Sequence, residues 1–132
     1  MSDTKSSWQK HVEMVAEKGV LAKQLYVILT KPTGSIDAVR DNLAEHLAYQ
    51  LELERKHIMF AAGPFADDKE QQWQGQGMII IRADSIEHAH EIAAADPMHK
   101  CGARDYRLRP WLLNEGSITI NVTYSNGGRE VL

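Results

Sequence analysis

The stretch "GMIIIRADSIEHAHEIAAADPMHKCG", residues 77–102, decides the predicted fold because a strand and a helix follow each other directly in it. The segment "GMIIIRA" is rich in β-branched residues and favours a strand. A helix is expected from Ile86 to Ala95, with Asp84 or Ser85 as its N-cap. Asp96 then stands at the helix C-terminus, where an anion is disfavoured by roughly 0.3–1 kcal/mol. A carboxylate at this position needs a compensating partner.

The rest of the chain repeats this alternation of strands and helices. Periodicity and turn residues predict an N-terminal helix and a long first helix of the core, followed by short strands. The order is βαββαβ, which is typical of an α+β ferredoxin-like plait with both helices on one face of an antiparallel sheet. The expected helices are Ser7–Gly19, Ser35 to about Arg55 and Ile86–Ala95, and the expected strands are Leu25–Thr30, His57–Gly63, Gly77–Ala83, Tyr106–Leu113 and Ser117–Tyr124.

The length of 132 residues suits a single domain. We expect a core plait over residues 25–116, a helical extension at 1–22, and an extra strand with a loose tail at 117–132. A plait of this kind has one uncovered sheet face, and the apolar strands cannot leave that face in water. A homodimer packed sheet to sheet is therefore expected, and the last strand could cross to the partner subunit.

Charge and composition exclude several classes of protein. The net charge is −3 with acidic and basic residues interleaved, which gives no electrostatic footprint for nucleic acid. The apolar runs are too short to span a membrane, and the polar start "MSDTKSSWQK" does not match a secretory signal. The single cysteine, Cys101, has no internal disulfide partner. These features predict a cytoplasmic protein without membrane or nucleic-acid partners.

The long first helix carries a histidine beside its apolar residues. Helical spacing predicts a core-facing stripe, and His46 falls inside the flank of that stripe rather than on the charged face. A histidine at a helix–sheet interface needs a hydrogen-bond partner, so it is either a satisfied core residue or a catalytic one. The expected stripe is Ile36, Val39, Leu43, Leu47 and Leu51.

His46 and Asp96 would satisfy each other if they meet, because both helices lie on the same face of the sheet. The carboxylate would hold one ring nitrogen and leave the other free to move a substrate proton. General acid–base catalysis of this kind contributes ~10²–10⁴ in rate. The alternative is that Asp96 precedes proline only as a helix stop.

At these residues the chain resembles the YCII-related proteins. The resemblance rests on "LYVILTKP", the helix with His46, "AAGPF", and the segment from "GMIIIRADS" to "RPWLLNEG", and it spans Leu25 to Gly116. Members of that family are small dimeric α+β barrels built on the ferredoxin-like plait. The resemblance implies that His46 and Asp96 form the catalytic pair.

The family includes an enzyme that removes HCl from a chlorinated hydroxyquinol, and its architecture is similar to that of muconolactone isomerases. The resemblance therefore implies a cofactor-free lyase acting on a small oxygenated ring, with His46 exchanging the proton and Asp96 orienting it. A proton-transfer isomerase and a non-catalytic ligand-binding dimer are the alternatives. An aromatic substrate needs apolar walls with a few polar anchors. The residues expected to line the substrate site are Phe65, Met98, His99 and Trp111.

Three other features carry less weight. His46, Asp96 and His99 are the residue types of an iron site with two histidines and one carboxylate, but Asp-Pro-Met-His offers no regular spacing to aim the last two ligands. No metal or other cofactor is therefore expected. His57 is expected at the start of a strand, and Cys101 as a half-buried structural thiol.

Overall fold

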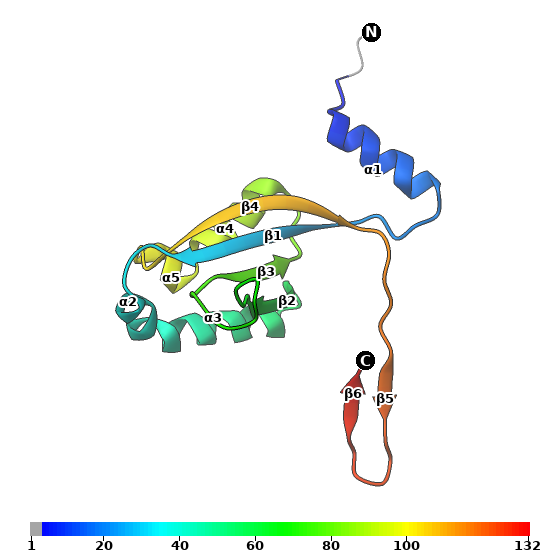
Figure 1. Ribbon diagram of the computed structural model, residues 1–132. Helices are drawn as coiled ribbons and strands as arrows, with labels where there is room; N and C mark the ends of the chain where they lie inside the picture. Colours follow the sequence, from blue (N-terminus) through cyan, green and yellow to red (C-terminus); the bar gives the residue numbers. More distant parts are fainter. Residues whose placement is uncertain (1–3) are drawn as a thin grey trace. The chain divides into compact units, whose positions relative to one another are not determined.

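The computed structural model describes residues 4–132 as a mixed α+β fold (Figure 1). The helices are α1 (Ser7–Glu17), α2 (Ile36–Asp41), α3 (Leu43–Arg55), α4 (Ile86–Ala94) and α5 (Pro97–Lys100), and the strands are β1 (Lys23–Pro32), β2 (Met59–Pro64), β3 (Gly77–Ile81), β4 (Arg104–Leu113), β5 (Ile120–Val122) and β6 (Arg129–Val131).

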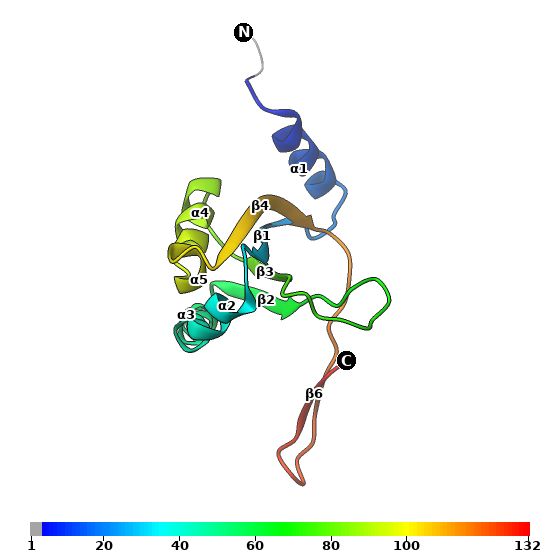
Figure 2. The ribbon, with the colours of Figure 1, turned by 60° about the vertical axis from the view of Figure 1, so that its left-hand side comes forward.

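Strands β1 to β4 form one sheet in the order β2-β3-β1-β4. Strand β3 is antiparallel to both of its neighbours. Its Ile81 lies opposite Tyr26 of β1, and its Met78 lies opposite Gly63 of β2. Helices α2 to α5 lie on one side of this sheet (Figure 2). This arrangement confirms the predicted ferredoxin-like plait.

The main core lies between the sheet and helices α3 and α4. Alternate residues of β1 and β3 point to the helices because side chains alternate between the two faces of a strand. Ile81 and Ala89 are completely buried there, and Leu53 of α3 is 5% exposed. The buried cluster consists of Tyr26, Ile28, Leu53, Ile79, Ile81, Ala89, Ile92 and Ala93.

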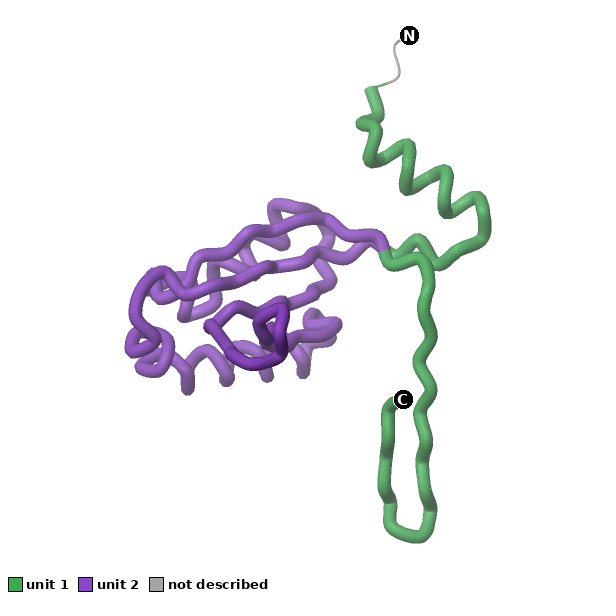
Figure 3. The backbone as a smooth tube through the Cα atoms, in the orientation of Figure 1, with its two compact units in different colours: residues 1–23, 113–132 green, residues 24–112 purple. Residues whose placement is uncertain are grey.

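The chain divides into two units (Figure 3). One unit, Gln24–Leu112, contains the plait with α2 to α5. The other joins the N-terminal segment up to Lys23, which holds α1, with Leu113–Leu132, which holds β5 and β6.

The long first helix of the core is interrupted, which differs from the prediction. Asn42 has φ −105° and ψ 8°, so α2 ends there and α3 begins. Its side-chain amide donates to the Ala38 carbonyl at 2.8 Å, and this local bond competes with regular helix geometry.

The prediction that the apolar stripe of this helix faces the core is wrong for much of its length. Val39 is buried, but Leu43, Leu47 and Leu51 are 43%, 50% and 63% exposed. The side of α3 that packs against the core carries Tyr49 and Leu53 instead. Periodicity identified an apolar face correctly but not what that face contacts.

His57 ends α3 rather than starting a strand. Its φ of 60° is left-handed, and its amide donates to the Glu54 carbonyl at 3.0 Å, while the amide of Ile58 donates to the Leu53 carbonyl at 2.9 Å. These two bonds form the Schellman motif that closes helix C-termini. The β2 strand therefore begins two residues later, at Met59.

The tail after Ser125 is ordered, which corrects the expectation of a loose end. Strand β6 pairs antiparallel with β5, with Asn121 opposite Glu130. Gly127 has a positive φ of 66°, and Asn126 Oδ1 accepts the amide hydrogen of Gly128 at 2.8 Å, so this Asn-Gly-Gly segment makes the turn. The predicted extra strand thus belongs to a hairpin of its own.

Candidate active site

Asp96 occupies the junction between two helices. It follows the C-terminus of α4 and is the N-cap of α5, where its Oδ1 accepts the amide hydrogen of Met98 at 2.9 Å. Pro97 takes the first position of α5, where its missing amide hydrogen costs nothing. The expectation that Asp-Pro-Met-His has no regular helical spacing is therefore wrong. The Asp96 carboxylate is favoured as the N-cap of α5 and disfavoured by the partial negative charge at the C-terminus of α4.

The side chain of His46 lies against this carboxylate. Its Nδ1 is 2.8 Å from Oδ2 and 3.0 Å from Oδ1 of Asp96, and Gln50 Nε2 donates to Oδ2 at 3.1 Å. Asp96 is 2% exposed and the His46 side chain 19%. The contact between His46 and Asp96 that the sequence predicted is therefore present, and Gln50 extends it.

The surroundings of Asp96 keep it ionised. Burial raises its pKa, but hydrogen bonds from His46 and from the Met98 amide outweigh this effect, and the pKa lies below its usual value of 3.8. An ionised carboxylate only accepts hydrogen bonds, so Nδ1 of His46 must carry the hydrogen. In a neutral imidazole Nε2 then holds a lone pair, and within residues 4–132 no hydrogen bond engages it. This is the arrangement that a general base needs.

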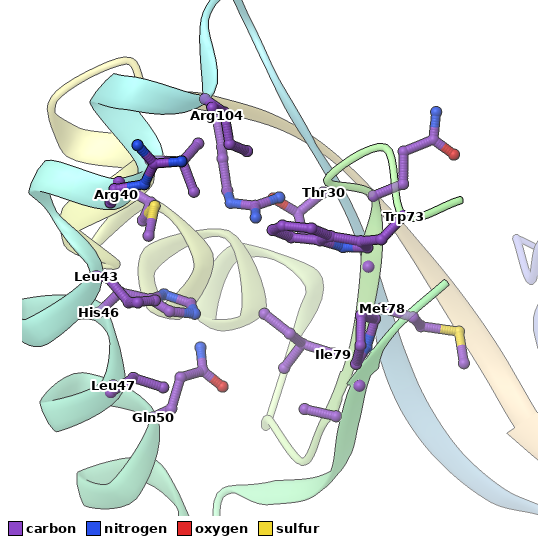
Figure 4. Close-up of a pocket in the computed structure, with 18 of the residues that line it drawn as sticks. Thr30, Arg40, Leu43, His46, Leu47, Gln50, Trp73, Met78, Ile79 and Arg104 are labelled. Carbon is purple, nitrogen blue, oxygen red and sulfur yellow. The ribbon is translucent and has the colours of Figure 1, made fainter. Parts of the chain in front are cut away.

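His46 lines a cavity of about 530 Å³ between the sheet and helices α2 and α3 (Figure 4). The apolar face of these helices, with Val39 buried and Leu43 and Leu47 exposed, forms one wall of the cavity. In Figure 4, His46 and Gln50 extend from α3, while Ile79 belongs to the strand across from them. The polar side chains that line it are Thr30, Arg40, His46, Gln50, Gln76 and Arg104.

The four residues expected as walls of the site have different positions. Met98 is completely buried and lines the cavity. Phe65 lines a second cavity of about 340 Å³, and His99 and Trp111 are not among the lining residues of either. Trp73 supplies the aromatic wall of the first cavity, although it comes from the polar loop between β2 and β3. A single tryptophan within "EQQWQGQ" was the only signal for it.

Arg104 is a further cavity residue that the sequence did not indicate. Its guanidinium donates to the Gly75 carbonyl, but its Nε is buried and has no hydrogen-bond partner within the described part of the chain. Burial lowers the pKa of Arg104, while the charge of Asp96 raises it. An arginine remains charged under these conditions, so Arg104 brings a cation to the lining of the cavity.

The iron-site alternative is not supported by the position of His99. Its two ring nitrogens face Thr30 Oγ1 and the Ala93 carbonyl, at 2.9 and 2.7 Å. Across residues 4–132, no three histidine, cysteine or acidic side chains gather in a way that could hold a metal ion. Cys101 is exposed rather than half-buried, because it caps the C-terminus of α5.

The chain is therefore a small α+β protein with an antiparallel plait, in which a histidine that lines a cavity is hydrogen-bonded to a buried aspartate. The chain belongs to the family with the YCII-related domain, which matches residues 24–112. The uncharacterized protein YjpA of Bacillus subtilis (strain 168) is 32% identical over 92 residues, which cover 68% of this chain and 96% of YjpA. In the part of the chain that the structure describes, no helix is long and apolar enough to cross a membrane.

A similar solved structure is that of an enzyme, 5-chloro-2-hydroxyhydroquinone dehydrochlorinase (TftG) from Burkholderia phenoliruptrix AC1100, in complex with 2,5-dihydroxybenzoquinone. It has a TM-score of 0.55 and 28% sequence identity, and the match covers 66% of this chain and 92% of that one. The similarity supports the shared fold.

Proposed function

We propose that this protein is a cofactor-free lyase that uses His46 and Asp96 for general acid–base chemistry on a small oxygenated ring. The most concrete form of the proposal is dehydrochlorination of a chlorinated hydroxyquinol. The observation that carries it is the unpartnered Nε2 of His46, which lines the cavity while Nδ1 is held by Asp96. The similarity to a dehydrochlorinase complexed with a dihydroxybenzoquinone supports the same class of substrate.

The proposed reaction needs only proton transfers. Nε2 of His46 takes the proton of a ring hydroxyl, a C=O bond forms, and the proton is returned to the ring carbon that bears chlorine. Loss of a second hydroxyl proton then forms a second C=O bond and expels chloride with the C–Cl bonding pair. The sum is the loss of one HCl and the formation of a hydroxybenzoquinone, with no external oxidant. Asp96 stabilises the imidazolium that forms at each proton uptake.

Arg104 has a separate role in this proposal. Negative charge develops on a ring oxygen when the hydroxyl loses its proton, and a fixed cation stabilises that charge more strongly in a cavity than in water. The location of Arg104 in the cavity lining supports this assignment. The apolar walls, with Trp73 and Ile79, suit the faces of an aromatic ring.

Replacing Arg104 with methionine is expected to lower kcat/KM for the chlorinated hydroxyquinol by about tenfold to hundredfold, because hydrogen bonds to charged groups contribute about 1.5–3 kcal/mol. Steady-state kinetics measures the change, with Arg104→Lys as the matched variant that keeps the charge and loses part of the activity. Arg107, which lies outside this cavity, provides the control Arg107→Met. Equal losses in the two methionine variants would contradict the role of Arg104.

The proposal is tested with the wild-type protein and chlorinated hydroxyquinol under anaerobic conditions. The expected result is release of one chloride per ring, measured with a chloride electrode, and appearance of the hydroxybenzoquinone absorbance. Proton exchange on a lactone without chloride release would favour the isomerase alternative. If calorimetry shows that the protein binds a ring compound but no tested ring is turned over, the non-catalytic ligand-binding alternative would be favoured.

We also propose that the protein is a homodimer in which the uncovered face of the sheet packs against a second copy. Leu29 is 38% exposed, and Val27 and Met78 on the same face are only half-buried. Covering such apolar side chains supplies about 25 cal/mol per Å² of buried apolar surface. Sedimentation velocity is expected to give the mass of two chains at micromolar concentration, and Leu29→Lys is expected to shift it toward one. A monomeric wild type would contradict the proposal.

A further inference from the structure

Thr30 and His99 form a hydrogen-bonded pair at the edge of the cavity. Thr30 is on β1 and lines the cavity, and its Oγ1 is 2.9 Å from Nε2 of His99 on α5. The other ring nitrogen, Nδ1, is 2.7 Å from the Ala93 carbonyl oxygen. The imidazole ring also packs against Tyr106, with 4.7 Å between ring centroids. Thr30 is 8% exposed.

The two hydrogen bonds determine where the protons lie. A carbonyl oxygen only accepts, so Nδ1 of His99 carries a hydrogen and donates it to Ala93. Burial lowers the pKa of His99 below its usual value of 6.5 and outweighs the hydrogen bond to the Ala93 carbonyl and the charge of Asp96, which raise it, so the ring is neutral at neutral pH. Nε2 of a neutral ring protonated on Nδ1 is an acceptor. Thr30 must therefore donate its only hydroxyl hydrogen to His99.

We propose that Thr30 is a specificity-determining residue that presents only acceptor lone pairs to the cavity, and that His99 is the positioning residue that holds it in this state. The inference rests on the proposed function, because it names the chemical group that the ring must carry at this point. That group is a hydroxyl that keeps its proton and donates it to Thr30 Oγ1. A ring with a methoxy group or a halogen at the same position offers no hydrogen to Thr30.

The rest of the cavity complements this arrangement. Arg104 only donates hydrogen bonds, and it suits a ring oxygen that becomes negative. His46 presents a lone pair and removes a proton. The three side chains therefore distinguish two kinds of ring oxygen: one that loses its proton to His46 and becomes negative beside Arg104, and one that stays protonated at Thr30. This selects polyhydroxylated rings over singly hydroxylated ones.

The test compares hydroxyquinol with its monomethyl ethers by anaerobic calorimetry. Wild-type protein is expected to bind hydroxyquinol more tightly than the ether that blocks the Thr30 contact, and Thr30→Val is expected to reduce this preference by about three- to tenfold, as a neutral hydrogen bond implies. Thr30→Ser keeps the hydroxyl and is expected to keep the preference. An unchanged preference in Thr30→Val, with ring binding intact, would overturn the inference and leave the proposed function standing.

His99→Phe tests the positioning role separately. It keeps an aromatic ring beside Tyr106 but removes the acceptor, which frees the Thr30 hydroxyl to donate to an ether oxygen. The preference for hydroxyquinol is then expected to fall although Thr30 is intact, a result that loss of packing alone would not produce. A preference equal to that of wild type would count against the role of His99.

A second measurement does not depend on any ring. Long-range proton–nitrogen NMR of the wild type at neutral pH is expected to show His99 protonated on Nδ1 and unprotonated on Nε2. An imidazolium, or a ring protonated on Nε2, would overturn the inference. If the wild type binds neither hydroxyquinol nor its ethers, the proposed function fails, and the nitrogen spectrum alone then decides whether Thr30 is an acceptor.

Discussion

Replacing His46 with glutamine is expected to lower kcat/KM for the chlorinated hydroxyquinol by ~10²–10⁴-fold, the range in which a positioned general acid–base contributes to rate. Glutamine keeps a donor that can reach Asp96, so the buried carboxylate retains a partner. It offers no group that accepts and returns a proton near neutral pH. The loss is therefore expected in kcat, with a small change in the affinity for the ring. Stopped-flow absorbance of the quinone product measures it.

A matched control separates the loss of the base from general damage. His57 is exposed and lies at the C-terminus of α3, outside the cavity, so His57→Gln is expected to retain wild-type activity. Circular dichroism and urea unfolding establish that both variants are folded. Turnover by His46→Gln within about tenfold of wild type would show that another group moves the proton. Collapse of the fold in this variant would instead indicate a structural histidine.

The meeting of His46 and Asp96 could be predicted because the topology allows it. A βαββαβ order places both helices on one face of the sheet, and an acid at the end of one helix needs a partner that a histidine on the other can supply. The same reasoning missed α5. Asp-Pro was interpreted as the end of a helix, but aspartate at the N-cap with proline in the first turn is equally the start of one.

The walls of the cavity could not be predicted in the same way. Helical periodicity shows that Leu43 and Leu47 share a face, but it does not distinguish a filled core from an open cavity, and these leucines line the cavity. Trp73 lines the cavity because the loop between β2 and β3 brings it there. Arg104 of β4 lines the cavity as well, and its guanidinium donates to the carbonyl of Gly75 in the same loop. Gly75 has a φ of 85°, and a Cβ there would meet the Pro32 ring at 2.4 Å. Such close approaches arise only in the folded chain.

Replacing Asp96 with asparagine is expected to reduce kcat/KM by ~10²–10⁴-fold while the protein stays folded, because the amide reverses the hydrogen bond to His46. The carboxylate accepts a hydrogen from Nδ1, whereas a side-chain NH₂ pointed at Nδ1 donates one. The imidazole is then protonated on Nε2, and the lone pair that should face the substrate is lost. Nitrogen NMR of His46 is expected to show this change of tautomer, which simple loosening of the site would not cause.

The same substitution has a predictable effect on stability against pH. The pKa of Asp96 is lower in the folded protein than its usual value of 3.8, so the unfolded chain takes up a proton first as the solution is acidified. The stability that the ionised carboxylate contributes is fully present above about pH 5, and it is lost as the pH falls through 3.8 toward the lower pKa of the folded state. Asp96→Asn has no such group to titrate. Its free energy of unfolding is expected to fall less between pH 5 and pH 3 than that of wild type.

Asp96→Ala removes the N-cap of α5 and leaves the partner nitrogen of His46 without an acceptor. Loss of a helix cap costs about 0.5–2 kcal/mol, and leaving a buried hydrogen-bond donor without its acceptor costs about 1–3 kcal/mol. We expect a decrease of about 3 kcal/mol in the free energy of unfolding at pH 7, measured by urea denaturation, against little change for the exposed Asp68→Ala. A helix cap requires only an acceptor for the Met98 amide, and an asparagine oxygen supplies that acceptor equally well. If Asp96→Asn kept wild-type turnover and His46 kept its tautomer, the role of Asp96 would therefore be that of a helix cap in contact with a histidine.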